Sequence, residues 1–174
     1  SSSAASDVYK RQNLVIKLLQ KGYDVIALDN CSRKGNINNL KYLQSIKTNN
    51  FFFINQDLTK YYTKEFDQTF KKIDCVFHLA AQVAVTTSLI DPKFDYLNNI
   101  DATFKLLERC RETKNNKIKF IFASTNKVYG KADNLKIKEG SKRYSYTKNI
   151  MGVSETQQLD FYSPYGLSLI HISE

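Results

Sequence analysis

Short apolar runs alternate with amphipathic segments along residues 13–123. The runs are rich in Val, Ile and Phe and predict buried strands at residues 24–28, 51–54, 75–79 and 118–123. Between them, apolar residues recur three or four positions apart, which predicts helices over residues 13–21, 36–46 and 63–72 and a long helix beginning at Pro92. We therefore expect an α/β fold with a doubly wound parallel sheet covered by helices on both faces. From residue 131 the pattern loosens, as in a long active-site loop.

Polar residues stand where the predicted strands end. Asp29 follows the first strand, and Ser124 and Thr125 follow the last. Ligands of open α/β sheets bind beyond the carboxyl ends of the strands, where an acid in the place of Asp29 holds the ribose of a dinucleotide. An acid there also favours NAD over NADP, because it repels a 2′-phosphate. The nearby positive charges of Arg33 and Lys34 weaken this preference. A lone Asp after a strand also caps turns and helices, and the Ser-Thr pair also suits a capped turn.

The stretch HLAAQ at residues 78–82 follows the third predicted strand. Small residues in that place let a ligand approach the backbone closely. His78 stands between Phe77 and Leu79 and is expected to be a packed core histidine rather than a base. Residues 13–166 contain no second histidine and no cysteine or carboxylate cluster at ligand spacing, so we expect no metal site.

The net charge of +9 raises the hypothesis of a nucleic-acid partner. However, the 21 lysines far outnumber the 5 arginines, they are scattered, and no stripe combines Arg with aromatic residues. Lys, Asn, Ile, Phe and Tyr have A/T-rich codons and are all abundant, so coding bias accounts for the charge. We expect no nucleic-acid partner.

Cysteine usage and hydropathy bear on the compartment. Cys31, Cys75 and Cys110 form neither a CxxC motif nor a disulfide framework, which favours a reducing cytoplasm. The longest apolar stretch, residues 75–85, is too short and too polar to cross a bilayer, and the first residues lack the pattern of a signal peptide. We expect a cytoplasmic protein with no membrane partner.

The two ends of the chain encode each other in antisense. Residues 7–12, DVYKRQ, read back as GAT GTG TAT AAG AGA CAG, and the reverse complement encodes LSLIHI, which is residues 167–172. This DNA resembles the end of a transposase-based sequencing adapter. We therefore expect residues 1–12 and 167–174 to be adapter-derived tails and residues 13–166 to come from the organism.

Residues 13–166 resemble the extended short-chain dehydrogenase/reductases, the NAD-dependent epimerase/dehydratase family that modifies nucleotide sugars. The likeness is carried in order by VIALDN, CSRKG, INQDL, DCVFHLAAQ, DPKFDYLNN, FIFASTNKVYG, GVSE and SPYG. Within the family, AAQVAVTTS, ASTNKVYG and LDFYSPYG are most similar to the CDP-paratose (CDP-tyvelose) 2-epimerases. The resemblance implies a partial NAD-binding Rossmann domain, a nucleotide-sugar substrate and a homo-oligomeric whole protein.

The resemblance also implies a role for individual residues. Thr125 and Tyr165 would be catalytic, the tyrosine as the base of a YxxxK motif, and Lys127 would meet the substrate. The residues that would hold NAD are Asp29, Asn30, Ser32, Arg33, Asp57, Leu58, Leu79, Ala80, Ala81, Gln82, Asn99 and Ser124. Tightly bound NAD would oxidise a sugar carbinol transiently, and the hydride would return to the opposite face. The motif's lysine lowers the pKa of the phenol, ordinarily about 10, so that it can act near neutral pH.

The chain departs from the family at both ends of the cofactor site. Leu169 stands where YxxxK has its lysine, residues 1–12 contain no glycine for the glycine-rich turn, and Ala102 replaces a usual glycine. We also expect the first strand and the substrate domain of the family to be missing from this chain. In the family's 3-2-1-4-5 strand order the first strand is central, so we expect two half-sheets with unpaired inner edges. Such a chain should be unstable or aggregating, should retain no NAD and should be inactive.

Two alternatives stay open. UDP-sugar 4-epimerases and 4,6-dehydratases share the superfamily and differ in the substrate-binding half, although Asn126 and Lys127 replace the acid pair of a dehydratase. A non-catalytic NAD-binding scaffold or sensor on the same fold is the alternative from another class. A lysine at position 169 of the complete gene would favour the enzyme.

Overall fold

The computed structural model describes residues 2–33, 35–113, 117–130, 132, 134–147 and 152–170. Its helices are α1 (Ser2–Gln20), α2 (Asn36–Ser45), α3 (Lys64–Phe70), α4 (Val85–Ile90), α5 (Pro92–Asp95), the π-helix η1 (Tyr96–Asp101), α6 (Ala102–Glu112), the 3-10 helix η2 (Asn126–Tyr129) and α7 (Pro164–Ile170). Its strands are β1 (Val25–Asp29), β2 (Phe51–Asn55), β3 (Cys75–His78), β4 (Lys119–Phe122), β5 (Ile137–Glu139) and β6 (Tyr144–Tyr146). Lys34 and residues 171–174 of the C-terminal tail lie outside this part of the chain.

Local sequence signals set most of the element boundaries, and the four predicted strands are confirmed. Gly22 follows α1 with a φ of 81°, a left-handed conformation that suits glycine. The Thr63 side chain caps α3 by accepting a hydrogen bond from the backbone N of Phe66 at 3.2 Å. Pro92 opens α5 as predicted, and Asp91 caps it by accepting from the N of Phe94 at 2.9 Å.

Other boundaries differ from the prediction. Helix α1 begins at Ser2 rather than at residue 13, because residues 2–12 contain neither glycine nor proline to end it. The predicted long helix is divided into α5, η1 and α6. The segment after residue 131, expected to be a loop, also contains the hairpin β5–β6 and α7. These elements and α4 are too short for a periodic signal in the sequence.

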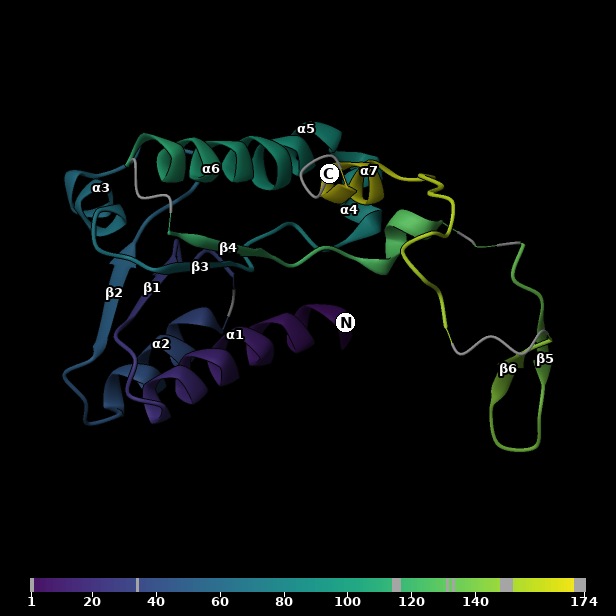
Figure 1. The fold of residues 1–174 in the computed structure, drawn as a ribbon, viewed down its shortest axis with the longest axis horizontal. Coiled ribbons are helices and arrows are strands. Elements are labelled where there is room, and N and C mark those ends of the chain that lie inside the picture. The colour runs from purple at the N-terminus through teal and green to yellow at the C-terminus, as the bar shows by residue number, and fades with distance from the viewer. Residues whose placement is uncertain are drawn as a thin grey trace.

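The strands form separate two-stranded sheets. Strand β1 runs parallel to β2 with Val25 opposite Phe51, and β3 runs parallel to β4 with Cys75 opposite Lys119. Within the described residues no ladder joins the two parallel pairs. The predicted α/β architecture and its division into half-sheets are therefore confirmed. The antiparallel hairpin β5–β6 projects away from the rest of the molecule, at the right of Figure 1.

The core lies where α3 and α6 meet the strands. Phe66 and Phe70 of α3 and Leu106 of α6 are almost completely buried. They pack against partly buried residues that include Val76 of β3 and Phe120 of β4. Figure 1 shows α6 running along one side of β3 and β4, while α1 and α2 lie together on the other side of the molecule.

The opposite face of β3 and β4 is incompletely covered. Phe77 and Ile121 are opposite each other in the ladder, yet they are 38% and 46% exposed. A parallel sheet is normally buried on both faces, so this pair forms an unusually open apolar face.

Candidate cofactor site and active site

Side-chain hydrogen bonds join the loops that follow β1, β2 and β3. Asn30 donates from Nδ2 to Oδ2 of Asp57 at 3.3 Å, which links the loops after β1 and β2. Arg33 donates from Nη2 to the carbonyl of Ala81 at 2.9 Å, which links the loops after β1 and β3. Predicted cofactor residues from three loops therefore meet at the carboxyl ends of the strands.

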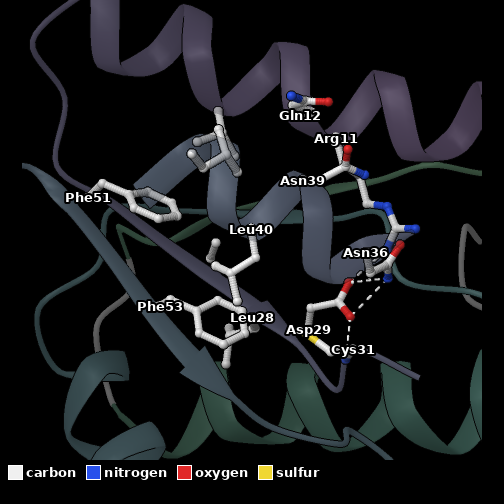
Figure 2. A pocket seen from close by; sticks show the side chains of 13 residues that line it. Arg11, Gln12, Leu28, Asp29, Cys31, Asn36, Asn39, Leu40, Phe51 and Phe53 are labelled. Carbon is white, nitrogen blue, oxygen red and sulfur yellow. Dashed lines mark hydrogen bonds and ion pairs between the residues drawn. The ribbon is translucent and has the colours of Figure 1, made fainter. Parts of the chain in front are cut away.

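The carboxylate of Asp29 is surrounded by donors. Asn36 Nδ2 lies 3.1 Å from each of its oxygens, the backbone N of Cys31 donates to Oδ1 at 2.6 Å, and Arg11 Nη1 reaches Oδ2 at 3.3 Å. Figure 2 shows this cluster at the polar end of a pocket between α1, α2, β1 and β2, whose other side is lined by apolar residues such as Leu28 and Phe53. A ribose could reach Asp29 only by displacing one of these donors. Asn36 was not predicted to belong to this site. The feature that could have indicated it is an amide side chain at the first residue of α2, the helix that follows Asp29.

Asp57 is held as a carboxylate by its own loop. Although burial alone would raise its pKa, hydrogen bonds from the Thr59 hydroxyl at 2.7 Å, the Thr59 backbone N at 2.9 Å and Asn30 hold the pKa below its usual value. Next to it, the Leu58 side chain packs against the core cluster. Asp57 therefore orders the turn that follows β2, a structural role that is common for an Asp after a strand.

Asn99 joins η1 to the loop after β3 and to α7. Its Oδ1 accepts from the backbone N of Gln82 at 2.7 Å, and its Nδ2 donates to the Gln82 carbonyl at 3.3 Å and to Ser168 Oγ at 2.9 Å. The Asn99 side chain is 1% exposed. In the same region Leu79, Ala80 and Ala81 are half-buried, and Ser32 is exposed with its backbone N donating to Asn30 Oδ1 at 3.1 Å.

His78 is a core residue, as the sequence predicted. Its Nε2 lies 2.8 Å from Thr103 Oγ1, and its ring packs against Phe120 and Phe122. The Thr103 hydroxyl already donates to the carbonyl of Asn99, so His78 donates to it and carries its proton on Nε2. Burial lowers the pKa of His78 to about 4. The His78 ring is therefore neutral, and its contacts are those of a packed core residue.

Ser124 and Thr125 lie at the turn that follows β4. Ser124 Oγ donates to the carbonyl of Leu169 at 3.0 Å, which ties the strand end to the last turn of α7. Thr125 Oγ1 accepts from the backbone N of Lys127 at 3.4 Å and caps η2. The Lys127 side chain is exposed. The Ser-Thr pair thus forms the capped turn that was its alternative role.

Helix α7 brings Tyr165 to the same place. Tyr165 is 8% exposed and Leu169, one helical turn later, is 2% exposed, so both occupy the inner face of α7. Helix α7 contacts η2, which Thr125 caps. An apolar Leu169 supplies no positive charge to lower the pKa of a phenol. The structure therefore brings together the segments that bear the two predicted catalytic residues, Thr125 and Tyr165.

Metal-ligand clusters and membrane spans were both sought in the described residues. Among the described residues no three His, Cys, Asp or Glu side chains lie together as a metal would require. In the same part of the chain no helix has both the length and the hydropathy to cross a bilayer.

The residues present fit only part of a dinucleotide. The loops after β1, β2 and β3 offer a ribose acceptor and small residues at a sheet edge. However, α1 is a continuous helix from Ser2, and residues 1–12 contain no glycine, so the turn that holds a diphosphate is lacking. The described residues alone therefore do not form a complete dinucleotide site.

The parallel half-sheets and the polar residues at their carboxyl ends define a Rossmann-like nucleotide-binding domain. A family model described as GDP-mannose 4,6 dehydratase matches residues 12–168. The chain therefore belongs to this family of NAD-dependent epimerases and dehydratases.

Curated relatives and solved structures agree with this assignment. The chain is 41% identical over 162 residues to the CDP-paratose 2-epimerase of Salmonella typhi, covering 90% of this chain and 45% of that protein. It is 33% identical over 159 residues to a putative UDP-glucose 4-epimerase of Methanocaldococcus jannaschii, covering 90% and 43%. The UDP-glucuronic acid 4-epimerase of Bacillus cereus, solved with UDP-glucuronic acid and NAD, superposes with a TM-score of 0.70 at 30% identity over 93% of this chain and 46% of that one. The chain thus spans less than half the length of these relatives.

Proposed function

We propose that the whole protein is an NAD-dependent nucleotide-sugar epimerase of the CDP-paratose 2-epimerase type, and that the present chain alone is inactive. The observation that carries this proposal is the 41% identity to the Salmonella typhi 2-epimerase across 162 residues. The packing of α7, which bears Tyr165, against the turn at Thr125 supports it.

In the whole protein, the predicted site residues would act at two ends of the cofactor. Asp29, with Asn30, Ser32 and Arg33, would hold the adenosine ribose, and Asp57 with Leu58 would meet the adenine. Leu79, Ala80, Ala81 and Gln82 would line the dinucleotide, Asn99 would fix that loop, and Ser124 would lie beside the nicotinamide. Bound NAD supplies a reversible hydride acceptor. Tyr165 would take the proton of the sugar hydroxyl that Thr125 holds by a hydrogen bond, and Lys127 would meet the substrate.

A UDP-sugar 4-epimerase is the second candidate. Solved 4-epimerases from Bacillus cereus and Campylobacter jejuni share the fold at 30% and 28% identity. The 2-epimerase is preferred because its identity to this chain is higher, 41% against 33% for the Methanocaldococcus relative over a similar length.

We also propose a compartment and an assembly state for the whole protein, and an origin for the two tails. Cys31, Cys75 and Cys110 are free thiols, which supports a cytoplasmic protein. We propose a homo-oligomer for the whole protein, and an adapter origin for residues 1–12 and 167–174 that the genomic locus would reveal.

The direct test is a tyrosine substitution in the whole protein recovered from its gene. Tyr165→Phe should abolish epimerisation of CDP-paratose while NAD stays bound, because only the phenolic oxygen is removed. Tyr162→Phe is the matched control, because Tyr162 lies three residues away in the sequence and is 48% exposed. An active Tyr165→Phe protein would refute the assignment of the base.

A further inference from the structure

Lys105 joins helix α6 to the loop that follows β2. Its Nζ donates to the carbonyl oxygen of Thr59 at 3.2 Å and pairs with the carboxylate of Asp101, four residues earlier, at 2.7 Å. The Lys105 and Asp101 side chains are 38% and 24% exposed, so solvent screens the pair only in part. Asp101 therefore helps to hold the ammonium group where it reaches Thr59.

Thr59 in turn holds the carboxylate of Asp57. The backbone N and the hydroxyl of Thr59 donate to Asp57 Oδ1 at 2.9 and 2.7 Å, and Asp57 Oδ2 accepts from Asn30 at 3.3 Å. A continuous series of hydrogen bonds thus runs from α6 through Thr59 and Asp57 to the loop after β1. The position of the Asp57 carboxylate therefore depends on where the Thr59 backbone is held.

Gln56 fixes the internal shape of the same loop. Its side chain is 5% exposed, and its Nε2 donates to the carbonyls of Asp57 at 2.7 Å and Tyr61 at 3.3 Å. Its Oε1 accepts from the backbone N of Thr63 at 3.2 Å. All three bonds lie within residues 56–63, so they shape the loop without attaching it to another element.

The Lys105 contact also bridges the two half-sheets. Thr59 follows β2, whereas α6 runs along β3 and β4 (Figure 1), and within the described residues no ladder joins the two parallel pairs. The Leu58 side chain packs against the core cluster that includes Leu106, but the burial of apolar surface has no preferred direction. A hydrogen bond from a charged donor is directional, so Lys105 fixes where the loop lies on α6.

We propose that Lys105 is a positioning residue for Asp57, because it holds the loop after β2 against α6 through the Thr59 carbonyl. The residues that form this contact lie within residues 13–166, which we expect to come from the organism, so the whole protein carries them as well. Only the consequence for NAD, whose adenine Asp57 would meet, rests on the proposed function.

Amide hydrogen exchange in the present chain measures the hold on the loop. The reporters are the backbone N–H groups of Thr59 and Lys60, which donate to the side chain and the carbonyl of Asp57. Lys105→Met should speed their exchange about fivefold, the effect of losing one hydrogen bond. Lys105→Arg keeps a charged donor and should retain the protection, and Lys72→Met, which removes an exposed lysine, is the matched control. Unchanged exchange in Lys105→Met would overturn the proposal.

A double variant tests whether Asp101 acts through Lys105. Asp101→Asn should also speed the exchange of the Thr59 amide, because the ammonium group loses the carboxylate that orients it. Lys105→Met combined with Asp101→Asn should be no faster than Lys105→Met alone. Additive effects would show that the two residues act independently and would overturn the proposed arrangement.

Release of NAD from the whole protein tests the consequence for Asp57. Lys105→Met should release NAD about fivefold faster than the original protein, whereas Lys105→Arg and Lys72→Met should release it at the original rate. A global loss of stability would not be rescued by Lys105→Arg in this way. Unchanged release from Lys105→Met would overturn the role toward Asp57. The exchange measurement uses neither NAD nor a sugar, so its failure would leave the epimerase proposal intact, and an inactive whole protein with a protected loop would refute the epimerase proposal alone.

Discussion

Gly166 of α7 lies directly against the backbone of Lys127 in η2. A Cβ atom built on Gly166 would stand 2.9 Å from the Lys127 carbonyl oxygen, closer than real side chains approach a backbone atom. The glycine therefore allows the helix that bears Tyr165 to pack on the turn that Thr125 caps. Neither helix could be placed this closely with any larger residue at position 166.

A larger residue at position 166 should destabilise the chain. Gly166→Ala gains about 1 kcal/mol of helix propensity, but the contact with a backbone atom costs about 1–3 kcal/mol, so the variant should be less stable. Gly152→Ala is the control, because no atom lies within 4 Å of its added Cβ, and it should be neutral or stabilising. Urea unfolding measures both. A Gly166→Ala chain as stable as the original would show that α7 is not packed as described.

Acid should destabilise the chain through His78. Burial lowers its pKa to about 4 in the folded state, so the unfolded chain binds the proton first as the pH falls. The free energy of unfolding should therefore lose about 3 kcal/mol between about pH 6.5 and pH 4 from this residue. His78→Gln, which keeps a donor for Thr103, should lack this loss, and the difference between the two denaturation curves removes the contributions of carboxyl groups.

The difference in unfolding free energy between the original chain and His78→Gln should change with pH only between about pH 6.5 and pH 4. Asp57 affects the stability of both chains at lower pH. Its folded-state pKa is held below the usual aspartate value, and the stabilisation it provides is lost as the pH falls through that lowered pKa. Parallel stability curves for the original chain and His78→Gln would contradict the buried, neutral histidine.

The open face of β3 and β4 should drive self-association. Ile121 is 46% exposed beside Phe77, and the two parallel pairs leave edge strands without ladder partners in the described chain. Sedimentation should show concentration-dependent aggregates, and Ile121→Lys should reduce them. Ile137→Lys on the hairpin, where Ile137 is 59% exposed, is the control and should have little effect.

The same chain should not retain NAD. Arg11 and Asn36 occupy the Asp29 carboxylate, and residues 1–12 contain no glycine for a diphosphate-binding turn. Calorimetric titration with NAD should therefore give no saturable heat. A cooperative thermal transition that shifts upward with added NAD would contradict this expectation.

The sequence predicted the fold well where its signals are local. Strands such as β3 and β4 are continuous apolar runs, and α3 begins at a threonine cap, so their positions follow from neighbouring residues. The short α4 and the hairpin β5–β6 were missed, because three to six residues carry no clear period. The division into half-sheets was predicted from the family's strand order rather than from any local pattern.

The sequence predicted which residues lie at the candidate site, but not which hydrogen bonds they form. The polar residues after each strand were identified, and Asn99 does reach the loop at Gln82. The bonds of Asp29 to Arg11 and Asn36 were not predicted, because they depend on how α1 and α2 pack on β1.

The most direct test of the central claim follows the hydrogen atom at the epimerised carbon. The whole protein, with its bound NAD, would be given CDP-paratose labelled with deuterium at C2, in ordinary water. We predict CDP-tyvelose that keeps the deuterium at C2, because the hydride removed from one face returns to the other. Loss of the label to solvent, or absence of any C2 epimer, would contradict the assignment.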